Sequence, residues 1–399
     1  MKESFLKAIP LLSKIQESGY EAYFVGGSVR DYLLEKEIAD VDIATSATPD
    51  EIRNIFPKTV DVGIEHGTII VLFNGIPYEV TTFRTEAEYV DFRRPSEVQF
   101  IRSLHEDLKR RDFTMNAIAM DKEGRFIDPF LGRQAIKEKM IKTVGKAEDR
   151  FSEDALRMMR AVRFYSQLGF RIEETTYQAL KTSASLLAKI STERKLAEFE
   201  KLLAGNNRIQ ALLVLADTGL LNYLPGMKPH IETITNIAKY DCSKLSVNEM
   251  WGLLLYLFKI DLHKVNDFMK NWKLPVKQIK KIHQLLFWLD FRERSNWTNK
   301  AMFDAGAEII EGTEKIYNVL HNQDVIIDIE RLLLSYHLLP IKQRGELQVT
   351  GTDLQEWYQK SPGPWIKEKL GEVEVAVLNK QISNRKDSLK EWLLGCNQS

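Results

Sequence analysis

The sequence contains little cysteine: Cys242 and Cys396 are the only two in 399 residues, and they lie far apart along the chain. They offer neither a disulfide framework nor a closely spaced thiolate pair for a metal. The seven histidines are scattered, without the short spacings typical of zinc sites. These absences argue against a disulfide-stabilised secreted scaffold and favour a cytoplasmic protein.

Long hydrophobic runs are also missing. The longest apolar stretches, such as residues 253–258, are too short to cross a bilayer. Residues 1–12 contain Lys2, Glu3 and Lys7 and lack the pattern of a signal peptide. We therefore expect a cytoplasmic location and no membrane partner.

Net charge is zero, but the charges are unevenly distributed. Residues 1–100 carry 10 basic and 17 acidic side chains, residues 101–300 carry 35 and 24, and residues 301–399 carry 11 and 15. An acidic first section followed by a basic middle fits a metal-binding catalytic head and a body that binds a polyanion. Charges scattered over solvated helices would give the same counts.

The hydrophobic pattern changes near residue 140. Before this point strand-like and helical stretches alternate, and the β-rich runs 68–73 and 78–83 are joined by the hairpin dipeptide Asn74-Gly75. From residue 148 to the end the period is helical nearly throughout. We expect an α+β protein whose head has a mixed sheet with helices and whose remaining domains are all-helical.

A glycine turn is the first candidate for a binding site. Residues 22–25 are predicted to form a short strand, residues 26–28 a tight Gly-Gly-Ser turn, and residues 29–34 a helix that begins there. A helix N-terminus after such a turn suits phosphate oxygens, and Arg30 adds a positive charge. Alone, a Gly-Gly pair is most often only a turn.

Paired aspartates follow the turn. Asp40 and Asp42 stand two apart in a strand-like run, so we expect both carboxylates on one face, with Val41 and Ile43 in the core. Two neighbouring carboxylates repel each other unless a cation lies between them, and Mg²⁺ takes such ligands together with substrate phosphates. Glu79 on a neighbouring strand could complete the site, although a plain surface glutamate is the more frequent case.

Charged residues recur every three positions in a second motif, at Asp154, Arg157, Arg160 and Arg163. In a continuous helix the first two share a face, whereas Arg163 lies well round it and has either a structural role or a different part of the site. An acceptor beside a donor matches the amino group and ring nitrogen of cytosine and adenine, and leaves unpaired groups against uracil and guanine. An intrahelical ion pair on a solvated face is the alternative.

A third candidate is the run 110–112. Its arginines, Arg111 among them, could bind triphosphate, and Asp112 could accept hydrogen bonds from ribose hydroxyls. A charge cluster at a helix end is the more frequent reading of such a run in isolation.

In this order, the motifs resemble those of the class II bacterial CCA-adding enzymes, close to those of Bacillus and related Firmicutes. These tRNA nucleotidyltransferases belong to the DNA polymerase β-like superfamily. The resemblance is carried by YFVGGSVRD with DVDIATSATP, by RRDFTMNAIAM, by RFSEDALRMMRAVRF and by the carboxy-terminal GELQVTGTDL. It spans essentially the whole chain.

The resemblance implies addition of CCA to the 3′ end of tRNA from CTP and ATP, with Mg²⁺ as the cofactor. It implies four sections: a head at 1–140, a neck at 141–205, a body at 206–295 and a tail at 296–399, of which the last two hold tRNA. The implied site residues are Asp40 and Asp42 for Mg²⁺, Gly27 and Arg30 for triphosphate, Arg111 and Asp112 for phosphates and ribose, Asp154 and Arg157 as the base template, and Arg160 and Arg163 as its support.

The resemblance leaves some alternatives open. A poly(A) polymerase, an A-only or a CC-only enzyme would share the head, although the family's flexible loop, here Glu86–Pro95, looks complete, as it does not in CC-only relatives. A catalytically inactive RNA-binding protein is disfavoured by the intact Asp40 and Asp42. The sequence contains no His-Asp dipeptide, so the phosphohydrolase domain of some relatives is not evident. A homodimer is a family expectation.

Overall fold

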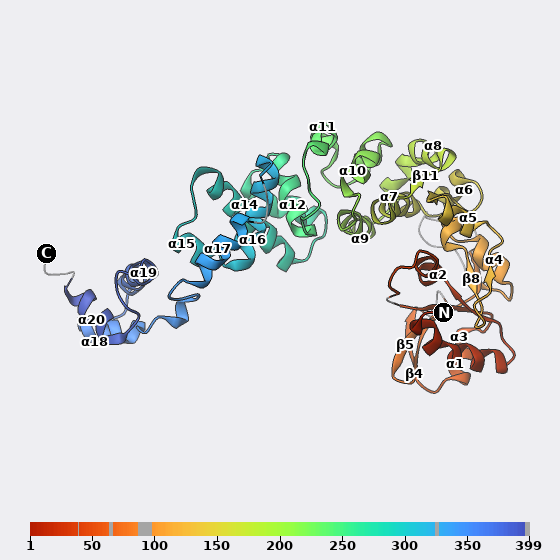
Figure 1. Ribbon diagram of the computed structural model, residues 1–399, viewed down its shortest axis with the longest axis horizontal. Coiled ribbons are helices and arrows are strands. Elements are labelled where there is room, and N and C mark those ends of the chain that lie inside the picture. The colour runs from red at the N-terminus through yellow and green to blue at the C-terminus, as the bar shows by residue number, and fades with distance from the viewer. Residues whose placement is uncertain (39, 64–66, 87–97, 324–326, 396–399) are drawn as a thin grey trace. The chain divides into compact units, whose positions relative to one another are not determined.

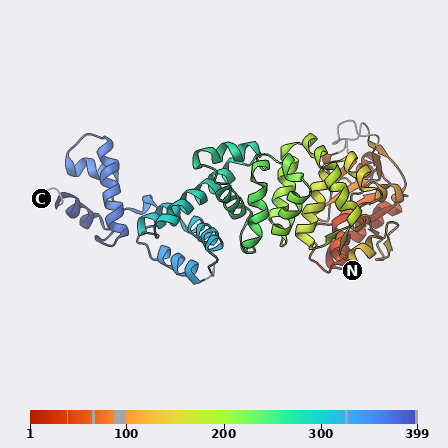
Figure 2. The same cartoon turned by 90° about the horizontal axis from the view of Figure 1, so that it is seen from above.

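The computed structural model describes residues 1–38, 40–63, 67–86, 98–323 and 327–395 (Figures 1 and 2). The chain forms two compact units, Met1–Ala238 and Lys239–Ser399. Within the described ranges, no helix is both long enough and apolar enough to cross a membrane. The predicted mobile loop Glu86–Pro95 lies outside the described residues beyond Glu86.

The first unit contains a seven-stranded sheet with the order β3-β4-β5-β2-β1-β8-β9. β2 and β5 run parallel, and the other neighbours run antiparallel. The mixed sheet predicted for the head is therefore confirmed. Its strands are β1 (Ala22–Val25), β2 (Asp42–Thr45), β3 (Thr59–Gly63), β4 (Thr68–Phe73), β5 (Ile76–Thr82), β8 (Ala119–Met120) and β9 (Phe126–Ile127), and β6 (Arg84–Glu86) pairs separately with β7 (Val98–Phe100).

The predicted hairpin is confirmed between β4 and β5. Phe73 pairs with Ile76 across a two-residue loop, in which Asn74 has φ of 51° and Gly75 has φ of 79°. Positive φ at both central positions is what a type I′ turn requires, and Asn-Gly tolerates it well. This turn fixes the register of β5 and hence the position of Glu79.

Local sequence signals explain where the helices before and after β2 begin. α2 (Gly26–Leu33) begins at the first glycine, three residues earlier than predicted, because Gly26 itself turns the chain with φ of +71°. α3 (Pro49–Ile55) begins after a capping box in which Thr48 and Glu51 bond each other's backbone N–H. Both helix starts lie next to strand ends of the central sheet.

Helices account for most of the remaining chain, as predicted. In the first unit these are α1 (Glu3–Glu17), α4 (Leu104–Lys109), α5 (Gly132–Lys137), α6 (Ala147–Glu153), α7 (Leu156–Leu168), α8 (Glu174–Ser183), α9 (Thr192–Leu203), α10 (Arg208–Asp217) and α11 (Ile231–Thr235). In the second unit they are α12 (Val247–Leu257), α13 (Leu262–Asn271), α14 (Val276–Arg294), α15 (Asn299–Ala305), α16 (Ala307–His321), α17 (Ile327–His337), α18 (Gly351–Tyr358), α19 (Pro364–Leu378) and α20 (Lys386–Gly395).

One short strand interrupts the region predicted to be entirely helical. β11 (Arg171–Ile172) pairs in parallel with β10 (Met140–Ile141). Gly169 ends α7 in a left-handed conformation, with φ of 68°, and the extended residues that follow bond the backbone of residues 139–141. Two residues are too few to show a strand period in the sequence, which is why this element was missed.

A cluster of buried residues joins the ends of β1 and β2 to α4. Val25 at the end of β1, Ala44 on β2 and Leu108 on α4 pack together with Phe83. Val25 also pairs with Asp42, so the last residue of β1 lies beside the first residue of β2. The glycine turn and the aspartates therefore meet at one edge of the sheet.

Candidate active site

Gly26 lies between two charged side chains at this edge. A Cβ atom on Gly26 would lie 3.3 Å from both Arg111 Nη1 and Asp42 Oδ2. The Ser28 hydroxyl donates a hydrogen bond to the Val25 carbonyl at 2.8 Å and closes the turn. Glycine therefore allows the sharp turn and also leaves space between a guanidinium and a carboxylate.

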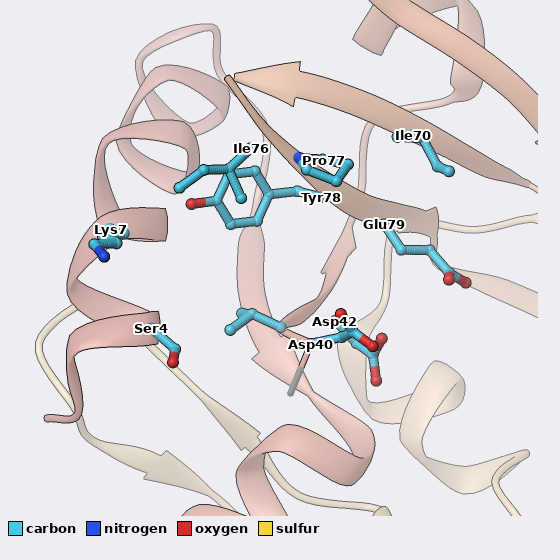
Figure 3. Close-up of a pocket in the computed structure, with 10 residues that line it drawn as sticks. Ser4, Lys7, Asp40, Asp42, Ile70, Ile76, Pro77, Tyr78 and Glu79 are labelled. Atoms are coloured by element: carbon cyan, nitrogen blue, oxygen red, sulfur yellow. The ribbon is translucent and has the colours of Figure 1, made fainter. Parts of the chain in front are cut away.

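Asp42 and Glu79 are paired positions on the parallel strands β2 and β5. Asp40 lies two residues before β2, whose pairing with β1 and β5 begins at Asp42. The prediction that both aspartates belong to the strand was wrong in this detail. All three carboxylates nevertheless line one cavity (Figure 3), and Val41 and Ile43 are buried as predicted.

The three carboxylates need a cation. None of them forms an ion pair or side-chain hydrogen bond with the part of the chain that the structure describes. Burial raises the pKa of Asp42 to about 6, the negative charges of Glu79 and Asp40 add to the rise, and Arg111 and Arg30 oppose it. A cation bound beside Asp42 would lower this pKa and stabilise the ionised carboxylate.

A divalent cation bound by two carboxylates fits these observations. Among the described residues no group of three or more His, Cys, Asp or Glu is arranged to hold a metal. Mg²⁺ characteristically binds one or two carboxylates and takes its other oxygens from water and substrate phosphates. The donor set suits a metal that arrives together with a phosphorylated ligand.

The raised pKa of Asp42 predicts a pH-dependent stability. A carboxyl group with a higher pKa in the folded state favours folding while protonated, and this contribution is lost as pH rises from its usual value of 3.8 through about 6. We expect Asp42→Asn to raise the Tm of the metal-free protein by about 2–4 °C near pH 8, and by much less near pH 4. Calorimetry with a chelator measures this difference, and an equal gain at both pH values would contradict it.

A second cavity, of about 910 Å³, adjoins Asp42. Its lining includes nine cationic and four anionic side chains, a balance that suits a polyanion such as a triphosphate. Every predicted nucleotide-site residue lines it. The charged lining residues are Arg30, Asp31, Asp42, Arg84, Arg110, Arg111, Asp112, Asp154, Arg157, Arg160, Arg163, Arg194 and Lys201.

Arg30 is held firmly at the floor of this larger cavity. It donates to Asn116 Oδ1 at 2.8 Å and to Asp31 Oδ1 at 2.9 Å. Its guanidinium carbon lies 5.1 Å from the ring centroid of Phe164, a cation–π distance. A buried and fully oriented guanidinium is suited to bind phosphate with little further loss of entropy.

Asp112 is the most firmly ionised carboxylate of the larger cavity. It accepts hydrogen bonds from Asn116 Nδ2 at 3.0 Å and from Arg160 Nε at 2.6 Å. Burial alone would raise the pKa of Asp112, but Arg160 and Asn116 outweigh it and lower the pKa to about 2. Arg111, which precedes it, donates to Asp107 at 3.2 Å and reaches the cavity beside Gly26.

The structure corrects the helical-face argument for Asp154 and Arg157. Asp154 has extended dihedrals (φ −136°, ψ 103°) and lies in the break between α6 and α7, so the two residues do not share a continuous helix. Asp154 accepts from the backbone N–H of Leu156 at 3.0 Å and from Arg194 Nη2 at 2.6 Å. Arg157 is buried and pairs with Glu153.

The alternative reading, an Asp154–Arg157 ion pair on a solvated face, is therefore also wrong. Arg157 further donates to the backbone carbonyls of Arg150 at 3.1 Å and Arg110 at 3.0 Å, which orients it by contacts outside its own turn. Both residues line the larger cavity, Asp154 from the helix break and Arg157 from the first turn of α7. The break between α6 and α7 brings both residues to the larger cavity, and the three-residue spacing in the sequence does not reveal it.

Arg163 has the structural partner that its position round the helix suggested. It forms a buried ion pair with Glu198 at 3.1 Å, and its guanidinium carbon lies 4.2 Å from the Phe164 centroid. Burial lowers the pKa of Arg163 to about 10, although Glu198 opposes the shift. Arg163 also lines the larger cavity, so it links the α9 side of the site to the nucleotide side.

Sequence reasoning missed four residues that position the site. They are Asn116, Phe164, Arg194 and Glu198. Asn116 and Phe164 lie inside motifs that were recognised, and a four-residue spacing from Asp112 was a usable signal for the former. Arg194 and Glu198 lie about 40 residues from their partners, on α9, and local spacing cannot reveal them.

Three family models match successive parts of the chain. They are "Poly A polymerase head domain" at residues 22–142, "Probable RNA and SrmB- binding site of polymerase A" at residues 169–231, and tRNA nucleotidyltransferase domain 2 at residues 244–393. The first covers the sheet and both candidate aspartates. The other two cover most of the helical part.

Full-length relatives carry the same architecture. The chain is 50% identical to the CCA-adding enzyme of Geobacillus sp. (strain WCH70), over 99% of this chain and 98% of that one. It is 46% identical to that of Bacillus cereus (strain B4264), over 99% of both. A crystal structure of the Bacillus stearothermophilus CCA-adding enzyme in complex with CTP matches with a TM-score of 0.93 and 46% identity, covering 100% of this chain and 98% of that one. At this identity over nearly its whole length, the chain belongs to the family of CCA-adding enzymes.

Proposed function

We propose that this chain, a tRNA nucleotidyltransferase that adds CCA from CTP and ATP, carries out the transfer where Asp42 borders the two cavities. The 3′ oxygen of tRNA forms a bond to the α-phosphorus, and the bond from that phosphorus to the leaving oxygen breaks. Pyrophosphate departs with the electron pair, and the hydroxyl proton passes to solvent. The observation that carries this placement is the set of unpaired carboxylates next to an arginine-lined cavity.

Asp40 and Asp42 would hold Mg²⁺. The raised pKa of Asp42, and the absence of an ion pair to either aspartate from the described residues, support this assignment. When bound, Mg²⁺ supplies charge stabilisation at the phosphate oxygens and lowers the pKa of the attacking hydroxyl. The protein's own part is to hold the two carboxylates together at the strand edge.

The triphosphate would lie at the turn before α2. The backbone of Gly27 and the oriented guanidinium of Arg30 offer donors there, and Arg111 approaches from the other side of Gly26. Asp112 would accept from the ribose hydroxyls with lone pairs that Arg160 and Asn116 leave over. Positioning by such fixed groups supplies much of the rate enhancement in phosphoryl transfer.

Asp154 and Arg157 would present the pairing edge to the incoming base, supported by Arg160 and Arg163. Asp154 already accepts from Arg194 and Leu156, and an ionised carboxylate has about four lone-pair sites, so it can accept a further bond from an exocyclic amino group. Cytosine and adenine offer that amino group beside a ring acceptor. The helix break supports the role, because it frees Asp154 from the geometry of either helix.

Gly26→Ala tests the turn. Gly26 and Gly19 both have positive φ, +71° and +91°, so alanine should cost about 1 kcal/mol of folding free energy at each. A Cβ on Gly19 meets nothing within 4 Å, whereas a Cβ on Gly26 meets Arg111 and Asp42. We expect similar losses in urea unfolding but reduced CMP addition for Gly26→Ala alone; equal activity losses in both variants would contradict the assignment.

The overall reaction is tested on a tRNA transcript that ends at the discriminator base. With Mg²⁺, we expect two additions from CTP alone and a third only when ATP is also present, resolved at single-nucleotide length. A stop at two additions with both nucleotides would indicate a CC-adding enzyme. A long ladder with ATP alone would indicate a poly(A) polymerase, and no addition at all an RNA-binding protein.

The second unit offers a phosphate-binding surface for tRNA. α14 and α16 border a cavity of about 870 Å³ that is lined by Lys277, Lys280 and Lys281. Such lysines hold duplex RNA through its phosphates, without reading sequence. We assign residues 1–140 to the head, 141–205 to the neck, 206–295 to the body and 296–399 to the tail, in a protein of the cytoplasm.

A further inference from the structure

A smaller cavity, of about 410 Å³, lies beside the aspartates and shares only Asp42 with the larger one (Figure 3). Its walls come from α1, from the segment that leads into β2, and from β5. On α1 these are Ser4 and Lys7, and on β5 they are Ile76, Tyr78 and Glu79. Asp40 and Asp42 form the side that faces the site.

Asp42 alone among the carboxylates borders both cavities. Gly26, Arg30 and Arg111 line only the larger cavity, whereas Asp40 and Glu79 line only the smaller one. The arginines suited to the triphosphate thus lie in the larger cavity, and Asp40 and Glu79 lie in the smaller one.

The in-line geometry of nucleotidyl transfer indicates from which cavity the tRNA hydroxyl attacks. In a phosphoryl-type transfer, the attacking and leaving oxygens lie roughly in line on opposite sides of the phosphorus. With pyrophosphate leaving toward Arg30 and Arg111, the attacking hydroxyl must approach from the side of the smaller cavity. We propose that this cavity binds the 3′-terminal nucleotide of the tRNA, with its backbone phosphate at Lys7 and its ribose and base against Ile76. The inference rests on the proposed function.

The walls have the chemistry that a terminal nucleotide needs. Ile76 is 37% exposed and offers an apolar contact at the start of β5, whereas Tyr78 is 4% exposed and packs behind it. An aliphatic contact makes no hydrogen bond to a base edge, so it accepts any base, as the enzyme must when the growing end changes. Lys7 is the one cationic residue of this wall, beside the neutral Ser4 on α1.

Lys7 can exchange its present partner for a phosphate. Its ammonium lies 2.7 Å from Glu3, and the two side chains are 56% and 79% exposed. Exposed pairs of this kind contribute little to stability, so releasing Glu3 costs little. No other lysine or arginine lines the smaller cavity among the described residues.

Lys7→Ala tests the phosphate contact. We expect kcat/KM for tRNA to fall about threefold to tenfold, with the KM for CTP unchanged. The slope of log KM for tRNA against log salt concentration should become shallower by about 0.7, the value for one single-strand phosphate. Lys7→Arg should restore most of the loss. Lys14→Ala is the matched control, because Lys14 lies on the same helix with its ammonium 5.0 Å from the Phe56 ring centroid, outside the cavity.

Ile76→Ala tests the apolar face in the same assay, with Leu72→Ala as its control. Leu72 is a similarly exposed aliphatic residue of the same hairpin that does not line the cavity. A rise in the KM for tRNA with Ile76→Ala but not Leu72→Ala supports the proposal. Unchanged tRNA kinetics in both Lys7→Ala and Ile76→Ala, or a rise in the KM for CTP instead, overturns it. Failure of the proposed function would be distinct, since wild-type protein would then add no nucleotide.

Discussion

Asp42→Asn is expected to reduce nucleotide addition by about three orders of magnitude, while tRNA binding is retained. A bound metal stabilises the transition state by several kcal/mol, and each 1.36 kcal/mol is a factor of ten in rate. Asn keeps the size of the side chain but removes the negative charge of the first residue of β2. Single-turnover addition of CMP and a separate tRNA-binding titration measure the two effects.

Asp61→Asn is a matched control for this variant. Asp61 lies on β3 of the same sheet, is exposed, and pairs with Arg53 away from both cavities. It should retain wild-type rates. Wild-type addition by Asp42→Asn would contradict the metal assignment, and equal loss of tRNA binding and addition would indicate misfolding rather than a missing ligand.

The second large effect is expected on base selection. Asp154→Asn should lower the preference for CTP over UTP by about tenfold to a hundredfold. A hydrogen bond to a charged group contributes about 1.5–3 kcal/mol, and an amide can offer a donor to the uracil carbonyl where the carboxylate cannot. The ratio of kcat/KM for the two nucleotides, measured on one tRNA end, gives the effect directly.

Glu148→Gln provides the control for base selection. Glu148 is an exposed acid on α6, in the helix that ends just before Asp154, and it does not line the larger cavity. Its nucleotide preference should match that of wild type. If Asp154→Asn lowers the rates with CTP and UTP equally, Asp154 orients the helix break and does not read the base.

The sheet and its turns could be predicted because their signals are local. Alternation at Val41 and Ile43, the Asn74-Gly75 turn and the Thr48–Glu51 capping box each depend on residues a few positions apart. Asp40 lies outside β2 because the pairing of β2 with β1 begins at Asp42, opposite the last residue of β1. The residues of a strand do not by themselves show where its pairing with neighbouring strands begins.

The sequence predicted which residues line the larger cavity better than it predicted how they are arranged there. Asp154 and Arg157 both reach the larger cavity, but through a break between α6 and α7 that the even three-residue spacing conceals. The partners that fix the site, Arg194 for Asp154 and Glu198 for Arg163, come from α9. Only the packing of α7 against α9 brings them together, and no pattern within either segment contains that information.

The most direct test of the central claim is a titration of Mg²⁺ into wild-type and Asp42→Asn protein, each saturated with a non-reactive CTP analogue, followed by calorimetry. If Asp40 and Asp42 hold the metal where the two cavities meet, wild-type protein should bind Mg²⁺ more weakly as pH falls through about 6, the pKa of Asp42, and the variant should lose most of the affinity at every pH. Equal affinity of the two proteins, with no dependence on pH near 6, would contradict the account.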